Sequence, residues 1–103
     1  MKRYPVVWRP SARADLLALY LWIADRADTE TAFGYTGAIE DHAAKLAEFP
    51  NRGTLRDDLS PGLHTTVYQR RTVIAYRVEE DRVEVLRLLH AGQEWKLHEE
   101  EAE

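Results

Sequence analysis

Cysteine is absent from this sequence of 103 residues. Its absence excludes disulfide bonds and thiolate metal ligands, and it fits the reducing cytoplasm in which we expect the protein to act. The longest unbroken apolar run, Leu16–Ala24, is far shorter than the ~20 residues that a membrane-spanning helix needs. No secretion signal is expected either, because only a brief apolar stretch precedes Arg9–Pro10. The sequence therefore indicates a protein without membrane contact.

A surplus of positive charge is also lacking. The chain has 14 Lys+Arg against 18 Asp+Glu, a formal net charge of −4. Proteins that act on a nucleic-acid backbone usually carry a basic surplus, because phosphate contacts supply much of their affinity. Acid is concentrated in Glu79–Asp81 and Glu94–Glu103, while Arg52–Arg71 holds four arginines against two aspartates. A locally basic face is compatible with this pattern, but direct binding to nucleic acid is not favoured.

Proline and glycine are sparse, with 4 and 5 copies, and neither repeats nor low-complexity tracts occur. A chain of this length has room for one domain. We expect a single domain over residues 1–97, followed by a flexible acidic tail over residues 98–103.

Two helices are expected after a short strand at Tyr4–Trp8. Pro10 fits the first turn of a helix, and Ser11 is a second candidate for its cap. Asp28 or Thr29 can cap the second helix, which Phe49–Pro50 ends. Glycines at positions 34 and 37 fall inside this second helix, where each costs about 1 kcal/mol relative to alanine. Close approach of the first helix is their most economical explanation, and it predicts an antiparallel helical hairpin.

Three strands follow, at Leu63–Tyr68, Thr72–Val78 and Val83–Leu89. Their short connections predict an antiparallel meander, because parallel pairing needs a longer crossover. In the last strand, alternation sets Val83, Val85 and Leu89 against Glu84, Leu86 and Leu88. The predicted fold class is α+β, in the order β-α-α-β-β-β, with the helical hairpin packed on one face of a small antiparallel sheet.

The first helix has more apolar positions than one core-facing stripe can use. Leu17, Leu21 and Trp22 lie partly off the stripe that contains Leu16 and Leu19. One reading is a helix buried on two sides. The thin core of so small a domain favours the other reading, a partner-binding face.

No catalytic motif stands out in the sequence. His64 at the start of a strand and His90 at the end of another could converge on one sheet edge with Arg70, Arg71 or Arg87. Such a cluster could perform acid–base and electrostatic work on a phosphodiester. Surface residues at strand ends are the simpler reading of the same positions. The four histidines do not have the spacing of metal ligands, so we expect no metal and no cofactor.

Several short patterns, in order, resemble ParE-type toxins of the RelE/ParE superfamily from Tyr4 to about Gly92. The junction after the second helix, Leu46–Gly53, reads L-x-x-F-P-x-x-G. The other matching segments are Tyr4–Trp8 with Pro10 and Ala12, Asp15–Leu16, Tyr20–Ile23, Leu55–Leu59, Pro61–Leu63, Val73–Val78 and Val83–His90.

The resemblance implies the toxin of a bacterial, plasmid-stabilising type II toxin–antitoxin pair, neutralised by a ParD-like antitoxin that docks on the helical hairpin. It further implies poisoning of DNA gyrase without chemistry of its own, and contact with DNA only through the antitoxin. The hairpin residues expected to bind the antitoxin are Leu16, Leu17, Tyr20, Leu21 and Trp22. The arginines expected to contact the target are Arg56, Arg70, Arg71 and Arg87.

Two positions depart from the ParE pattern. His64 stands where such chains commonly have arginine, and Gln93–Glu94 replaces the usual Arg–Asp. A ribosome-dependent mRNA endoribonuclease of the RelE type is the alternative, with His64, Arg70, Arg71, His90 and His98 as its candidate residues. The acidic chain end disfavours an RNA substrate. A weakly toxic protein that only binds its antitoxin is the third reading.

Overall fold

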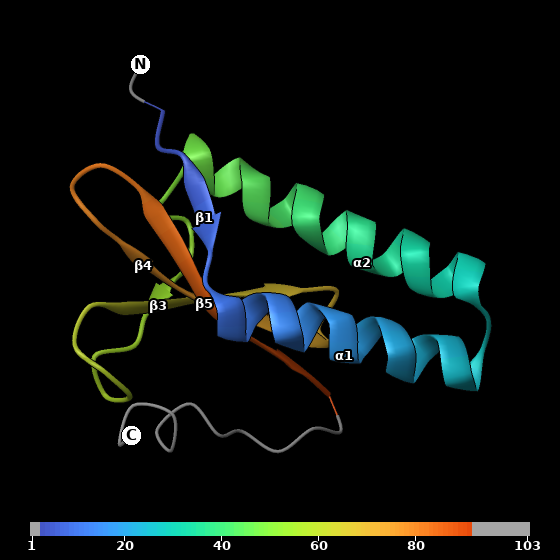
Figure 1. Ribbon diagram of the computed structural model, residues 1–103. Helices are drawn as coiled ribbons and strands as arrows, with labels where there is room; N and C mark the ends of the chain where they lie inside the picture. The colour runs from blue at the N-terminus through green and yellow to red at the C-terminus, as the bar shows by residue number, and fades with distance from the viewer. Residues whose placement is uncertain (1–2, 92–103) are drawn as a thin grey trace.

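The computed structural model describes residues 3–91, which form a helical hairpin packed on one five-stranded sheet (Figure 1). Along the sheet the strands follow the order β1-β5-β4-β3-β2. Their bounds are β1 Val6–Trp8, β2 Thr54–Leu55, β3 Leu63–Tyr68, β4 Thr72–Val78 and β5 Val83–His90. The α+β class and the antiparallel meander β3-β4-β5 are confirmed.

The sheet is mixed, so the prediction of an antiparallel sheet throughout is wrong. Strand β1 pairs in parallel with β5, with Val6 opposite Val83 and Trp8 opposite Val85. This pairing is possible because the whole helical hairpin and the meander lie between the two strands and form the crossover. The two-residue strand β2, which was not predicted, adds an antiparallel edge beside β3.

The hairpin consists of α1, Pro10–Arg26, and α2, Thr29–Ala44, which a short 3-10 turn at Lys45–Ala47 extends. Pro10 occupies the first turn of α1, as predicted. Asp28 caps α2 by accepting a hydrogen bond from the Thr31 N–H at 2.6 Å, and this backbone hydrogen bond lowers the pKa of its carboxyl group. Ser11 does not cap α1, because its hydroxyl donates instead to the Leu86 carbonyl at 2.8 Å.

A bulge in β5 changes which side chains face the helices. The register shifts between Ala75 and Tyr76, where Ala75 pairs with Arg87 but Tyr76 pairs with Val85. Leu86 is therefore the extra residue, and Val85 and Leu88 both enter the core under the helices. The predicted alternation in β5 holds through Leu86 and is wrong for Leu88 and Leu89, because the bulge inverts the faces beyond it. The main core cluster consists of Ala12, Leu19, Ile39, Ala43, Ile74, Val85 and Leu88.

The two glycines of α2 do not lie against α1, contrary to the prediction from the sequence. A Cβ atom built on Gly34 or Gly37 would meet no atom within 4 Å. Close approach of α1 therefore does not explain them, and the prediction was wrong. Nothing in the structure explains why glycine occupies these two positions.

Gly53, at the end of the L-x-x-F-P-x-x-G pattern, does have a steric reason. A Cβ there would lie 2.5 Å from the Thr65 carbonyl oxygen and 2.6 Å from the Tyr76 hydroxyl. That hydroxyl donates to the Pro50 carbonyl at 2.9 Å and accepts from the Gly53 N–H at 3.1 Å. Tyr76 thus ties the turn after α2 to the middle of the sheet, and burial raises the pKa of its phenol.

Candidate functional site

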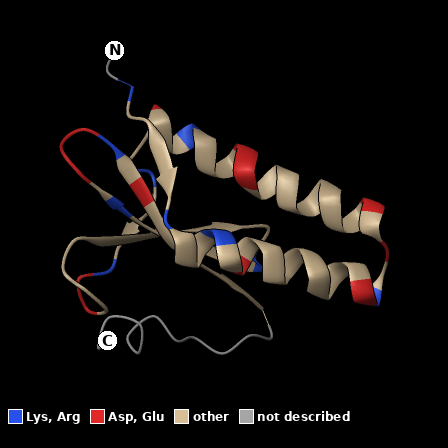
Figure 2. Cartoon of the chain, in the orientation of Figure 1, with Lys and Arg blue, Asp and Glu red and all other residues tan. Residues whose placement is uncertain are grey.

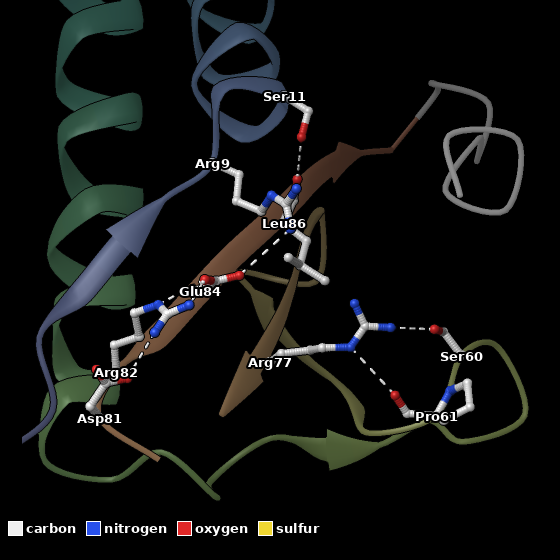
Figure 3. A network of polar contacts seen from close by, with 9 residues as sticks. All are labelled: Arg9, Ser11, Ser60, Pro61, Arg77, Asp81, Arg82, Glu84 and Leu86. Atoms are coloured by element: carbon white, nitrogen blue, oxygen red, sulfur yellow. Dashed lines mark hydrogen bonds and ion pairs between the residues drawn. The ribbon is translucent and has the colours of Figure 1, made fainter. Parts of the chain in front are cut away.

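Helix α1 is fixed to the sheet along the edge of β5 that the short strand β1 leaves open. Ser11 and Asp15 lie one helical turn apart and both reach this edge. The Ser11 hydroxyl satisfies the Leu86 carbonyl, as Figure 3 shows, and the Asp15 carboxylate accepts from the Leu88 N–H at 2.9 Å. The opposite face of α1 is thereby turned toward solvent.

The solvent face of the hairpin is apolar at three positions. Leu17 and Leu21 are 59% and 56% exposed, and Phe33 on α2 is 74% exposed. Leu17 and Leu21 lie one helical turn apart, and neighbouring apolar side chains with this much exposed surface are typical of interaction surfaces. Of the residues predicted for antitoxin binding, Leu17 and Leu21 are thus the exposed ones. Phe33 was not predicted, although a large aromatic residue outside the buried positions of α2 (Ala32, Thr36, Ile39 and Ala43) could have indicated it.

The other three predicted hairpin residues are half-buried. Leu16 and Trp22 pack against the core cluster, and Tyr20 is partly covered. The Trp22 ring also contacts the edge of His90, with ring centroids 5.4 Å apart, and carries the Arg26 guanidinium 4.1 Å from its centroid. These side chains have a structural role whether or not a partner touches their remaining surface.

The structure separates His64 and His90, which we expected to converge. His64 pairs with Tyr76 near the end of β4, whereas His90 pairs with Thr72 at its beginning, so they lie at opposite ends of the sheet. The His64 ring stacks on Tyr76 with centroids 5.3 Å apart. The expected convergence is wrong, because β3 and β5 run parallel with β4 between them. His98, the third candidate histidine, lies outside the described residues.

His90 lies in the core at the end of β5. Only 5% of its surface is exposed, and its Nδ1 shares a 2.9 Å hydrogen bond with the Thr72 hydroxyl. The Thr72 hydroxyl in turn lies 2.9 Å from the Tyr35 hydroxyl, so the chain of hydrogen bonds joins β5, β4 and α2. Burial, aided by the positive charge of Arg71, lowers the pKa of His90. The imidazole is therefore held neutral and connects the hairpin to the sheet.

We expect the buried histidine to make the fold sensitive to mild acid. Because the folded-state pKa lies below the unfolded value, the unfolded chain binds more protons between the two. The contribution of neutral His90 to the free energy of unfolding is therefore fully present above the unfolded pKa. It is lost as the pH drops below that value, by at most about 1.4 kcal/mol per pH unit for one proton. Urea unfolding of wild type and His90→Gln between about pH 7.5 and about pH 5.5 should show a flatter profile for the variant.

His42 contributes in the same direction, because burial and the charges of Arg52 and Lys45 lower its pKa as well. The double variant His90→Gln/His42→Gln should therefore be flatter than either single variant. Equal slopes in all four proteins would show that neither histidine controls the response.

The four predicted arginines divide into two groups. Arg87 is held by the Asp15 carboxylate through two hydrogen bonds of 2.7 and 3.0 Å, and Arg56 is held by Asp58 at 2.8 and 2.9 Å. Arg70 and Arg71 instead lie exposed in the turn between β3 and β4. Arg70 and Arg71 are therefore exposed to solvent, whereas Arg87 fastens α1 to the sheet through Asp15.

The turn that carries Arg70 has an unusual backbone. Gln69 and Arg70 both have positive φ, at 51° and 61°, and the Arg71 N–H donates to the Tyr68 carbonyl at 3.1 Å. Two-residue hairpin turns of this kind strongly prefer asparagine and glycine. The turn formed by Gln69 and Arg70 has neither, so each of the two residues stores backbone strain on the order of 1–3 kcal/mol. Strain of this kind is most common at functional sites.

Charge is distributed unevenly over the surface. Figure 2 shows acidic residues where α1 meets α2 and in the turn between β4 and β5.

Among residues 3–91 there is no cluster of three or more His, Asp or Glu side chains arranged to hold a metal ion. In this same part of the chain no helix is both long and apolar enough to cross a membrane.

Residues 6–95 match the family model described as "ParE toxin of type II toxin-antitoxin system, parDE". The chain belongs to the ParE toxin family. Among curated proteins, none matches the chain. Membership makes it the toxin component of a type II toxin–antitoxin system.

Two solved structures have the same fold as this ParE-family chain. The chromosomal ParDE system from P. aeruginosa aligns over 85% of this chain and 96% of that one, with a TM-score of 0.76 and 25% identity. The toxin–antitoxin complex RelBE2 from Mycobacterium tuberculosis aligns over 85% of this chain and 98% of that one, with a TM-score of 0.63 and 26% identity. Both neighbours are toxin–antitoxin systems, which supports an antitoxin as the partner of this ParE-family toxin.

Proposed function

We propose that this ParE-family toxin inhibits DNA gyrase, and that a ParD-like antitoxin neutralises it by docking on the helical hairpin. The match to the ParE toxin model over residues 6–95 carries the proposal. The higher TM-score with the ParDE system than with RelBE2, over the same share of this chain, favours the ParE branch over the RelE branch.

The hairpin supplies the antitoxin-binding surface in this proposal. Leu17 and Leu21 lie one turn apart on α1, and Phe33 adds an aromatic side chain from α2. An amphipathic helix of the antitoxin can bind here by laying its own apolar face over these side chains. Leu16, Tyr20 and Trp22 would border the contact with their exposed edges.

The turn between β3 and β4 supplies the contact with gyrase. Arg70 and Arg71 are adjacent, exposed and carried on a strained turn. Arginine is enriched in the few residues that dominate protein–protein affinity, because its planar head makes several hydrogen bonds at once. We assign Arg56 and Arg87 a lesser part, since each is already held by an aspartate.

A gyrase assay with the purified toxin tests the proposal. We expect inhibition of supercoiling or trapping of cleaved plasmid, reversed by the antitoxin. Loss of hydrogen bonds from charged groups removes about 1.5–3 kcal/mol each, so Arg70→Ala/Arg71→Ala should need at least about tenfold more toxin. The double variant's control is Arg13→Ala, which changes an exposed arginine of α1.

Normal supercoiling and no cleaved DNA at a large excess of toxin would exclude gyrase as the target. Mapping of mRNA ends after induction then tests the endoribonuclease reading, which requires cuts within translated codons. Neither effect would leave a weakly toxic protein that binds its antitoxin.

A further inference from the structure

The outer face of the sheet, opposite the helices, has an apolar row that crosses three strands. Leu89 of β5 pairs with Val73 of β4, which pairs with Val67 of β3. Their neighbours Leu88, Ile74 and Tyr68 pack toward the helices, so these three side chains point to the opposite side. Val67 is 52% exposed, and the row is therefore accessible to an occupant.

A groove of about 340 Å³ continues this row toward the loop after β2. Its lining consists of Arg56, Leu59, Thr65, Val67 and Val73. Leu59 is 39% exposed, so aliphatic surface from the loop faces aliphatic surface from the strands. Arg77 borders the same face, where it donates to the Pro61 carbonyl at 3.4 Å and to the Ser60 hydroxyl (Figure 3).

The described chain ends beside this row. The Ala91 N–H donates to the Arg71 carbonyl at 2.6 Å, which fixes the exit of β5 next to the turn between β3 and β4. Ala91 is two residues beyond Leu89. Because neighbouring strands lie about 4.8 Å apart, Val67 is roughly 10 Å from Leu89 across the sheet. Four further residues can span about 13 Å, so Trp95 is within reach of the groove.

The sequence beyond Ala91 has the chemistry to fill the groove. Trp95 and Leu97 are its two large apolar residues, at the alternate spacing of an extended segment that places both on one side. The acidic run Glu99–Glu101 follows them. A tryptophan side chain alone can bury about 150–250 Å² of surface, which is enough to cover much of the apolar row.

We propose that Trp95 and Leu97 dock intramolecularly on the outer face of the sheet, with Trp95 against Val67 and Val73 and the following acidic residues toward Arg77. The segment covers the apolar row of its own chain. A partner that binds the outer face must first displace it. The inference concerns the isolated chain and requires neither the antitoxin nor gyrase.

NMR of the full chain tests this arrangement. We expect nuclear Overhauser effects from the Trp95 indole protons to the methyl groups of Val67 and Val73, and amide exchange around Trp95 slowed by about tenfold. Val67→Asp should abolish both signals, because it places a carboxylate in the apolar row. Leu21→Asp is the matched control, since it changes a similarly exposed apolar residue, 56% exposed, on the opposite side of the molecule.

Three outcomes would overturn the proposal. Unprotected amides and random-coil shifts beyond Ala91 would show that nothing docks. Contacts found only between differently labelled copies, and lost on dilution, would assign the groove to a second copy of the chain. Contacts of Trp95 with the hairpin would place the segment on the wrong face.

Discussion

Replacing Gly53 with alanine should destabilise the fold by about 2–3 kcal/mol, in the upper range for an overpacked site. The new methyl group would lie 2.5 Å from the Thr65 carbonyl oxygen and 2.6 Å from the Tyr76 hydroxyl. The first atom belongs to the backbone of β3, and the second ends a ring with no exposed surface. The Tyr76 hydroxyl cannot move without breaking its hydrogen bonds with the Pro50 carbonyl and the Gly53 N–H. The Thr65 carbonyl belongs to a strand that pairs on both sides, with β2 and with β4.

Urea unfolding followed by circular dichroism measures the effect as a lower midpoint at an unchanged slope. The chain offers two matched controls, Gly34→Ala and Gly37→Ala, where a methyl group meets no atom within 4 Å. Alanine there should stabilise α2 by about 0.5–1 kcal/mol, because it restricts the unfolded chain. Equal effects at all three glycines would show that the turn at Gly53 relaxes freely.

Much of the fold could be predicted because local signals determine it. Pro10 and Asp28 mark the starts of the two helices, and the short connections between the last three strands correctly predicted their antiparallel pairing. The parallel pairing of β1 and the bulge at Leu86 depend on contacts between distant segments. The sequence of a strand has no periodicity that indicates a parallel partner or a bulge, so the faces of β5 beyond Leu86 were wrongly predicted.

The candidate site could be predicted only in part. Surplus apolar positions on α1 identified Leu17 and Leu21, which are exposed in the structure. Residue type alone could not separate the arginines, because whether Arg87 or Arg70 is available depends on where Asp15 lies in space. The same limit applies to His90, whose burial follows from the phase of the bulged strand and from Trp22 above it.

Helix α1 therefore has two sides with separate tasks. One side fastens the helix through Ser11 and Asp15 to the backbone of β5. The other side leaves Leu17 and Leu21 exposed to solvent. Because the fastened side fixes the orientation of the helix, the exposed side is preorganised, which reduces the entropy lost on binding.

Changing Leu21 to aspartate should weaken the complex with the antitoxin by roughly 100-fold, within the range of interface hot spots. The substitution removes an apolar contact and forces a carboxylate into the interface, where an unpaired charge is costly. Leu21 is 56% exposed in the free chain, so the fold itself should change little. Titration calorimetry with the purified antitoxin measures the affinity, and urea unfolding checks the stability of the variant.

Leu55→Asp is the matched control, because Leu55 is 53% exposed and lies on β2, away from the hairpin. It should leave the affinity within about threefold of wild type. Leu17→Asp should weaken binding as Leu21→Asp does, and the double variant should lose less than the sum, because neighbouring contacts are not additive. Full affinity in Leu21→Asp and loss of affinity in Leu55→Asp would transfer the antitoxin interface from the hairpin to the sheet edge. The gyrase assay without antitoxin would be unaffected by that result, so the two halves of the proposed function can fail separately.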